Sequence, residues 1–501
     1  MSTLRRRIAN NTRYSLQEDR LVFMPKILCE KAIIIYLFAM MGCVALYSAH
    51  ILSLKWWIFG LVCVLGFFYF ANRHTKLWVN TRPFAFTKKL FWTAFALRVL
   101  WVLISFGLYY YWTGAAFSIN AADEFVYHAA ASDIANAIRD GNFRIFSVAQ
   151  FSMGHYESIS DLGYPIYLGI NYFLFGNSIL IARIIKALLS AWTVILIYRV
   201  ASRNFGESTG RMAAIFCMLM PNLIYYCSFQ LKEVEMVFLA MLFIERADYL
   251  LRQGQLKFLP IAALMLIPLF LFMVRTALAA TLVAAFLCAL LLTSGRIVGL
   301  GKRIVIGVVA GLFAISMVFS NTSIGNDVRE MWQTGGSKQQ DFVEWTSQRV
   351  DQSGMKQNFA KYTGAAVFAP MIFTIPFPTM TETSGQENQK MIHGGNFVKN
   401  MMSYFTIMAL VVLLFSGAWR KHVLLIAVLC GYLVILVFSS FAHSERFHQP
   451  ILPLTLMFAA LGISLIKDNP WIKRYFDYWC VLMFLAAIAW NWFKLAGRGM
   501  I

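Results

Sequence analysis

The sequence predicts an all-α polytopic membrane protein. The 501-residue chain is 59% hydrophobic and only 14% charged, whereas soluble proteins usually carry about a quarter charged residues. Its mean hydropathy is +0.63. Apolar runs of roughly 17 to 25 residues recur along the whole length, and each is long enough to cross about 30 Å of hydrocarbon. Because these runs are continuous rather than alternating, a transmembrane β-barrel is not expected.

About thirteen crossings are predicted, within a range of about eleven to fourteen because helix ends are uncertain by several residues. They are expected near residues 32–49, 56–72, 90–113, 179–201, 210–228, 235–251, 257–274, 276–294, 303–320, 401–418, 421–441, 447–466 and 476–493.

The charge pattern predicts the orientation of these spans. Placing the N-terminus in the cytoplasm puts most lysines and arginines in short cytoplasmic connections, as the positive-inside bias requires. Most acidic residues then fall on the outer face, and topology does not explain their placement, because acids contribute little to orientation. The predicted regions are a cytoplasmic tail (1–31), a transmembrane core (32–320), an outer segment (321–400) and C-terminal transmembrane helices (401–501).

Composition also excludes some classes of partner and site. A net charge of +20 is compatible with nucleic-acid binding, but the chain lacks the basic-aromatic tracts of single-strand binders. The eight cysteines are scattered and none has CxxC spacing. Neither a zinc site nor a disulfide framework is therefore indicated.

Two outer segments are long enough to carry structure of their own. The first, 114–178, contains a predicted interfacial helix over 121–140. Its expected apolar positions are Phe125, Ala129, Ile134, Ala137 and Ile138. A second half-apolar piece, 163–176, is either another membrane-lying helix or a short extra span. In the outer segment 321–400, the proline-broken apolar patch 364–380 is expected to be re-entrant or interfacial, because it is too short and interrupted to span.

Four charged groups share the predicted outer face. They are Asp123–Glu124, Lys232–Glu233, Arg275 and Glu445–Arg446. Charges are expensive near hydrocarbon and are rare there without a partner or a task. Each group also has a structural interpretation, as a solvated acidic pair, a helix end, a snorkelling arginine or a local ion pair. If they face one cavity, an arginine can hold a lipid phosphate and a carboxylate can take a proton from a hydroxyl.

At these residues the chain resembles the GT-C superfamily of polyprenyl-phosphate-sugar-dependent glycosyltransferases, particularly bacterial relatives of protein O-mannosyltransferases and the lipid A aminoarabinose transferase. The likeness covers roughly 91–275 and the segment around Arg446. It rests on the order and sidedness of an early Asp123–Glu124 pair, Gly163–Pro165, Phe175–Ser178, Ala182–Arg183, Asn204–Gly206, Pro221, Lys232–Glu233, Arg275, Glu445–Phe447, Pro450 and Pro453. Two spans precede the first loop where many relatives have one, and no large C-terminal soluble domain is expected, unlike in the oligosaccharyltransferase branch.

The resemblance implies an inverting sugar transfer in a bacterial plasma membrane, with the site facing the exterior. It implies that Asp123 is the catalytic base, that Glu124 supports substrate or a divalent cation, and that Arg275 and Arg446 hold the lipid phosphate. The other implied cavity residues are Tyr127, His128, Lys232, Glu233 and Glu445. The implied partners are a polyprenyl-phosphate-linked sugar, a glycan, lipid or protein acceptor, and the bilayer. No metal ligands are assigned, since the histidines lack a shared metal spacing.

Two alternatives remain open from the sequence. One is a glycan polymerase or ligase that uses a lipid-diphosphate donor, because it too needs outer arginines. The other is a non-enzymatic lipid or sugar transporter or scaffold. Transporters more often place charges at mid-membrane on broken helices, whereas these charges are predicted near one surface.

Overall fold

A computed structural model describes most of the chain. The described residues are 21–119, 121–154, 161–253, 258–293, 373–383, 387–438, 444–496 and 499–501. Within them the chain is helical, and its only β-pairing is an isolated bridge between Ile51 and Thr381. The predicted span 303–320 and most of the outer segment 321–400 lie outside these residues.

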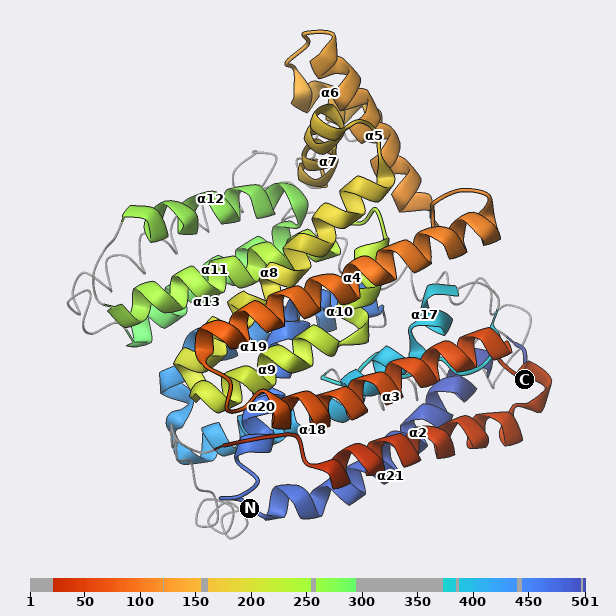
Figure 1. The fold of residues 1–501 in the computed structure, drawn as a ribbon, viewed down its shortest axis with the longest axis vertical. Coiled ribbons are helices and arrows are strands. Elements are labelled where there is room, and N and C mark those ends of the chain that lie inside the picture. Colours follow the sequence, from red (N-terminus) through yellow and green to blue (C-terminus); the bar gives the residue numbers. More distant parts are fainter. Residues whose placement is uncertain are drawn as a thin grey trace.

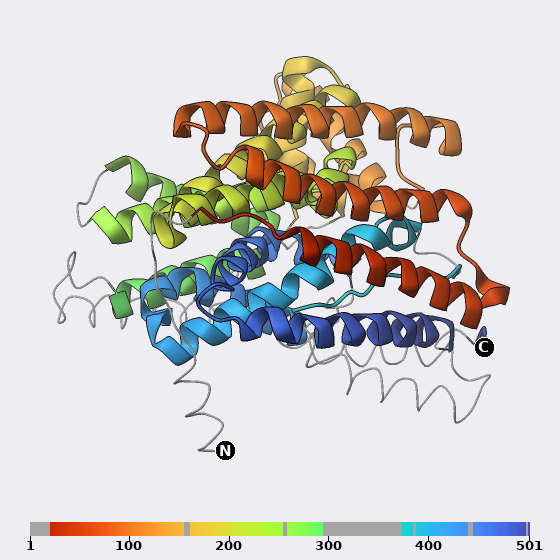
Figure 2. The same ribbon diagram turned by 60° about the horizontal axis from the view of Figure 1, so that its bottom comes forward.

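Eight helices of the described chain are long and apolar enough to cross a membrane, which confirms the predicted all-α polytopic membrane fold. They are α2 (Lys26–Leu46), α3 (Leu54–Leu77), α4 (Pro83–Thr113), α8 (Ile179–Phe205), α18 (His393–Ser416), η4 (Ala418–His422) with α19 (Val423–Phe438), η6 (Glu445–Ile451) with α20 (Leu452–Ser464), and α21 (Trp471–Ala496). The shorter apolar helices α12 (Phe258–Val274) and α13 (Thr276–Thr293) and the more polar α11 (Glu233–Gln253) run alongside them (Figures 1 and 2).

The basic turns gather at one end of this bundle, called the basic end below. Arg211 donates to the carbonyl oxygen of Trp78 at 3.0 Å, and Arg252 donates to Asn204 at 2.6 Å. The η4 residue His422 lies 3.1 Å from the same Asn204. The first described helix starts at this end, whereas the C-terminus lies at the opposite end (Figure 1).

The predicted span 210–228 is wrong as a single helix. The chain forms α9 (Glu207–Leu219), breaks, and continues as α10 (Pro221–Tyr225) and η2 (Tyr226–Ser228). Pro221 lacks an N–H and disfavours helical backbone in the residue before it, and Met220 has φ −61° and ψ 115°. The buried Arg98 of α4 donates to the carbonyl oxygens of Met218 and Cys217 at 3.3 and 3.2 Å, which satisfies the open end of α9.

Residues 373–383, the described part of the proline-broken patch and its continuation, are extended and almost entirely buried. Their backbone is satisfied by polar side chains of α18 and α21. Lys399 donates to the carbonyl oxygen of Ile375 at 2.5 Å, and the Asn491 side chain donates to that of Pro378 at 3.0 Å and accepts from the Met380 N–H at 2.7 Å. Non-helical backbone at membrane depth requires such internal partners. The choice between a re-entrant and an interfacial element stays a prediction.

The first long loop forms three helices that stand out from the bundle at the top of Figure 1. They are α5 (Ala122–Arg139), α6 (Ile145–Met153) and α7 (Gly163–Phe175). Helices therefore form over both predicted segments, and packing within the protein decides which face of α5 is buried. Phe125 is 51% exposed, whereas Tyr127 and Ala131 are buried. The cause is α7, whose Gly169 lets the backbone of the two helices approach closely at Ala131.

Glycines also let α3 pack directly on α18. A Cβ added to Gly60 would lie 2.2 Å from the His393 ring and 2.4 Å from the Tyr36 hydroxyl, two groups that share a 2.9 Å hydrogen bond. A Cβ on Gly394 would lie 2.3 Å from the Gly60 carbonyl oxygen. Small residues commonly permit such close helix contacts within membranes.

Gly60→Ala is expected to destabilise the protein by about 1–3 kcal/mol, the usual effect of overpacking. Unfolding of the purified protein in nanodiscs measures it. Gly66 lies on the same helix with nothing within 4 Å of an added Cβ, so Gly66→Ala should be neutral or stabilising by up to about 1 kcal/mol. Equal stability of the two variants would contradict the close α3–α18 contact.

Candidate functional site

The described chain contains a cavity of about 280 Å³. It lies where the start of α5, the turn after η2, the short helix α17 (Glu387–Met391) and η6 meet. The start of α5 and the helix α17, which contribute to the lining of the cavity, lie at the end of the bundle opposite the basic end (Figure 1). The residues that line the cavity are Ser118, Ala122, Asp123, Glu124, Tyr225, Tyr226, Phe229, Leu231, Asn388, Gln389, Ser444, Glu445 and Arg446. The cavity therefore brings together segments that are more than 300 residues apart in the chain.

Arg446 links two carboxylates at this cavity. Its Nη1 pairs with Asp123 and its Nε pairs with Glu233. The Asp123 side chain is 57% exposed, whereas that of Glu233 is 3% exposed. Arginine carries five N–H donors in a planar fork, so these two contacts leave donors on Nη2 for a ligand. Three residues singled out from the sequence thus form one connected charge group.

Glu124, the neighbour of Asp123, is held by the protein on both of its oxygens. Oε1 accepts from the Ser118 hydroxyl at 2.5 Å and the Ser118 N–H at 3.2 Å, and Oε2 accepts from the Gln230 N–H at 2.8 Å and from Arg183 at 3.3 Å. The residue is 1% exposed although it borders the cavity. This arrangement assigns Glu124 a positioning role, because it ties the start of α5 to α8 and to the turn before α11.

Glu445 lines the cavity and keeps one carboxylate oxygen without a partner in the described chain. Its Oε1 accepts from the Tyr226 hydroxyl at 3.3 Å, and its Oε2 has no hydrogen-bond partner in the described chain. The residue is only 4% exposed. A buried acceptor without a partner is costly, so a hydroxyl donor from a ligand would stabilise it.

Lys232 and Arg275 lie beside the cavity without lining it. Lys232 pairs with Asp161 and donates to the carbonyl oxygen of Val274 at 3.0 Å. Burial lowers the pKa of Lys232 well below its ordinary value, and the nearby charge of Arg275 lowers it further. The Arg275 guanidinium lies 4.6 Å from the ring centroid of Phe447, the residue after Arg446. The Arg275 guanidinium therefore contributes positive potential behind the cavity wall, next to Arg446.

Tyr127 and His128 do not line the described cavity. Tyr127 packs edge-on against Tyr164 of α7, with ring centroids 5.0 Å apart. Its hydroxyl lies close enough to interact with the charges of Arg446 and Glu233. His128 Nδ1 shares a 2.8 Å hydrogen bond with the hydroxyl of Tyr172, and burial lowers the pKa of this histidine. Their contacts hold α5 against α7, and a role of either residue in substrate binding stays a prediction.

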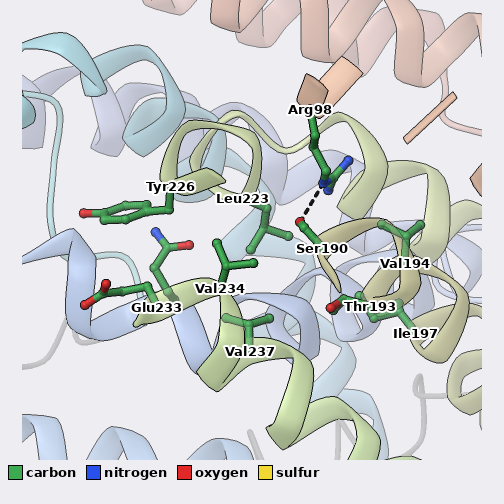
Figure 3. A pocket seen from close by; sticks show the side chains of 11 residues that line it. Arg98, Ser190, Thr193, Val194, Ile197, Leu223, Tyr226, Glu233, Val234 and Val237 are labelled. Carbon is green, nitrogen blue, oxygen red and sulfur yellow. Dashed lines mark hydrogen bonds between the residues drawn. The ribbon is translucent and has the colours of Figure 1, made fainter. Parts of the chain in front are cut away.

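A second pocket lies between α4, α8 and α11. Figure 3 shows Arg98 and Ser190, joined by a 2.6 Å hydrogen bond, on one side of it and Tyr226 and Glu233 on the other. Its volume of about 10 Å³ is close to what one water needs. It is too small for a substrate, so the larger cavity is the candidate site.

Several contributors to the site were not singled out from the sequence. Gln230 supplies a backbone donor and Asp161 pairs with Lys232. Asn388 and Gln389 line the cavity from α17. Uncharged amides in a polar stretch are common in loops, so nothing in the sequence marks Asn388 or Gln389 as part of a site. In the described residues, no three His, Cys, Asp or Glu side chains gather in a way that could hold a metal ion.

Comparison with known proteins adds no assignment. No protein-family model matches the chain, and no curated protein matches it.

Glu124→Gln is expected to destabilise the protein by about 3–5 kcal/mol, the usual effect of breaking a buried ion pair, because Arg183 would keep a buried charge without a carboxylate partner. Denaturant unfolding in micelles measures the change. Glu30 is an exposed acid paired with Lys26 at 3.4 Å on α2. Glu30→Gln should change stability by less than about 1 kcal/mol, and a similarly small effect of Glu124→Gln would contradict the positioning role.

Proposed function

We propose that this protein is a membrane glycosyltransferase that moves a sugar from a polyprenyl-phosphate donor to an acceptor hydroxyl. The observation that carries the proposal is the placement of Asp123 and Arg446 side by side in one cavity at an end of the helical bundle. A carboxylate and a guanidinium at a membrane boundary suit a substrate with a sugar, a phosphate and a lipid tail. The proposed reaction has two steps.

The first step is donor binding. A phosphodiester is an anion, and Arg446 can bind it through charge-assisted hydrogen bonds. Arg275 adds positive charge behind the wall. The donor phosphate competes with Asp123 for Arg446, so its arrival releases the carboxylate. The lipid tail would lie between the apolar helices, in the bilayer.

The second step is transfer. The acceptor oxygen attacks the anomeric carbon while the bond from that carbon to the phosphate oxygen breaks. Asp123 takes the acceptor's proton as general base, and polyprenyl phosphate leaves with the bonding electron pair. Arg446 stabilises the charge that develops on the phosphate. A single displacement of this kind inverts the anomeric configuration.

We infer the orientation from the distribution of charge. Lysines and arginines are enriched in short loops on the cytoplasmic side of a membrane. The basic end of the bundle therefore lies in the cytoplasm, and the cavity opens on the other side. This matches the use of a lipid carrier, which presents the sugar where soluble nucleotide sugars are absent. We propose a bacterial plasma membrane as the location and a glycan, lipid or protein as the acceptor.

Asp123→Asn should lower turnover by roughly 10²–10⁴-fold, the usual contribution of a general base, without weakening donor binding, since Asn no longer competes as an anion for Arg446. Transfer of radiolabelled sugar from polyprenyl-phosphate donors in proteoliposomes measures turnover. Asp133→Asn changes an exposed acid on the same helix and should leave turnover unaltered. Full activity of Asp123→Asn would remove the proposed base.

Arg446→Lys should weaken donor binding about tenfold or more, because an ammonium keeps the charge but loses the planar fork. Equilibrium binding of a fluorescent polyprenyl-phosphate sugar to protein in nanodiscs measures it. The control is Arg144→Lys, an exposed arginine before α6, which should bind the donor as the original protein does. An unchanged affinity in Arg446→Lys would count against the phosphate role.

The released lipid separates this reaction from the alternatives. Mass analysis of the lipid product should find the monophosphate. Release of a diphosphate would instead assign the protein to the lipid-diphosphate polymerases and ligases. Movement of intact donor across the membrane without covalent transfer would identify a transporter, and the break at Pro221 is where such a protein would be expected to bind substrate. Arg98 at that break is hydrogen-bonded to protein carbonyls instead.

A further inference from the structure

The wall of the cavity formed by α17 carries two carboxamides with defined orientation. Lys494 donates to Oε1 of Gln389 at 3.0 Å. Lysine is a donor only, so the Gln389 oxygen must face Lys494 and its amide NH₂ group must face elsewhere. Because this side chain lines the cavity, the NH₂ group supplies a donor there.

Asn388 repeats the arrangement one residue earlier. The hydroxyl of Tyr225 donates to Asn388 Oδ1 at 3.1 Å. Its NH₂ group is then also left to donate, and Asn388 lines the same cavity. Two adjacent amide donors therefore line the same cavity as Asp123 and Arg446.

Buried contacts hold this wall in place. Lys390, the next residue, is 1% exposed and donates to Glu387 at 2.5 Å and to the Thr383 carbonyl oxygen at 3.1 Å. The Lys390 carbonyl oxygen lies 2.7 Å from Nδ1 of the buried His393 at the start of α18. Fixed donors lose little entropy on binding and therefore discriminate well between ligands.

The cavity also offers an acceptor to the same ligand. Glu445 Oε2 is buried and has no partner within the described chain. Hydroxyl groups both donate and accept hydrogen bonds, so amide donors and a carboxylate acceptor in one small space match a sugar with several hydroxyls. A volume of about 280 Å³ is at the lower limit for small-molecule pockets, which fits one monosaccharide.

We propose that Gln389, Asn388 and Glu445 form the subsite that recognises hydroxyl groups of the transferred sugar, and that the sugar is neutral. This inference rests on the proposed function and names the residues that select its substrate. Gln389 is the central specificity residue. A sugar hydroxyl that faces Gln389 can accept a hydrogen bond from its amide NH₂ group. A hydrogen atom at the same ring position cannot accept, and a protonated amine there has no lone pair with which to accept. Sites built to bind a hydroxyl reject analogues that lack it.

The test compares sugar selectivity in the original protein and in Gln389→Glu. The substitution keeps the shape and strengthens the contact with Lys494, but it replaces the NH₂ donors by an acceptor. The probes are polyprenyl-phosphate hexoses, either fully hydroxylated or with a hydrogen or an amine replacing the hydroxyl at C2, C3, C4 or C6. Binding competition in nanodiscs is measured first, and it does not require turnover.

The original protein should bind the hydroxylated probe roughly 3- to 10-fold more tightly than at least one deoxy probe, the effect of a neutral hydrogen bond. Gln389→Glu should lose this preference at one ring position and keep it at the others. The matched control is Asn136→Asp, which makes the same change beside Arg139 on the exposed face of α5 and should leave the selectivity profile unchanged.

A selectivity profile that is the same in Gln389→Glu and the original protein would overturn the subsite. So would tighter binding of an amino sugar than of the hydroxylated probe. These results are distinguishable from failure of the proposed function. If the original protein releases polyprenyl phosphate and Gln389→Glu has the same sugar selectivity as the original protein, the transferase proposal stands and the proposed subsite is wrong. If no donor is bound or transferred by the original protein, both fall.

Discussion

A polar group placed inside a membrane protein must find its partner within the protein, and this constraint organises the whole structure. Arg98 caps the broken end of α9, and Lys399 and Asn491 satisfy an extended segment between helices. Glu124 is enclosed by four donors. Apart from the contacts between Glu124 and Ser118, these contacts join segments that are at least 24 residues apart in the sequence. The polar residues therefore determine which helices are neighbours, and the apolar residues fill the space between them.

The cavity gathers charged groups that are exposed or exchangeable. Asp123 is largely exposed, and Glu445 keeps an oxygen without a partner in the described chain. Arg446 is satisfied by two carboxylates, yet it borders open space. Buried polar atoms without a hydrogen-bond partner also occur elsewhere in the described residues, as at Ser202 and Asn222. What distinguishes Asp123, Glu445 and Arg446 is that they line one space of about 280 Å³, and this is the physical reason to assign binding there.

Much of the fold could be predicted from the sequence, because long apolar runs have few alternatives to membrane helices. Asp123 and Arg446 could also be singled out, since charges beside such runs are rare. The break at Pro221 was missed because the surrounding residues are apolar enough to read as one span. The buried face of α5 depends on α7, and the role of Glu124 depends on Arg183, which is 59 residues away. Neither contact leaves a periodic or local signal in the chain.

The glycine contact between α3 and α18 has a consequence for the shape of the cavity. Gly60 and Gly394 bring the two backbones together, and α17 leads directly into α18, so that side of the chamber is part of a stiff unit. The α5–α7 hairpin projects from the bundle and meets the cavity only at its first turn. At that first turn, Glu124 anchors α5 to Arg183 of α8 and to the Gln230 backbone. Both sides of the chamber are therefore braced by buried contacts, and its shape is set before any ligand arrives.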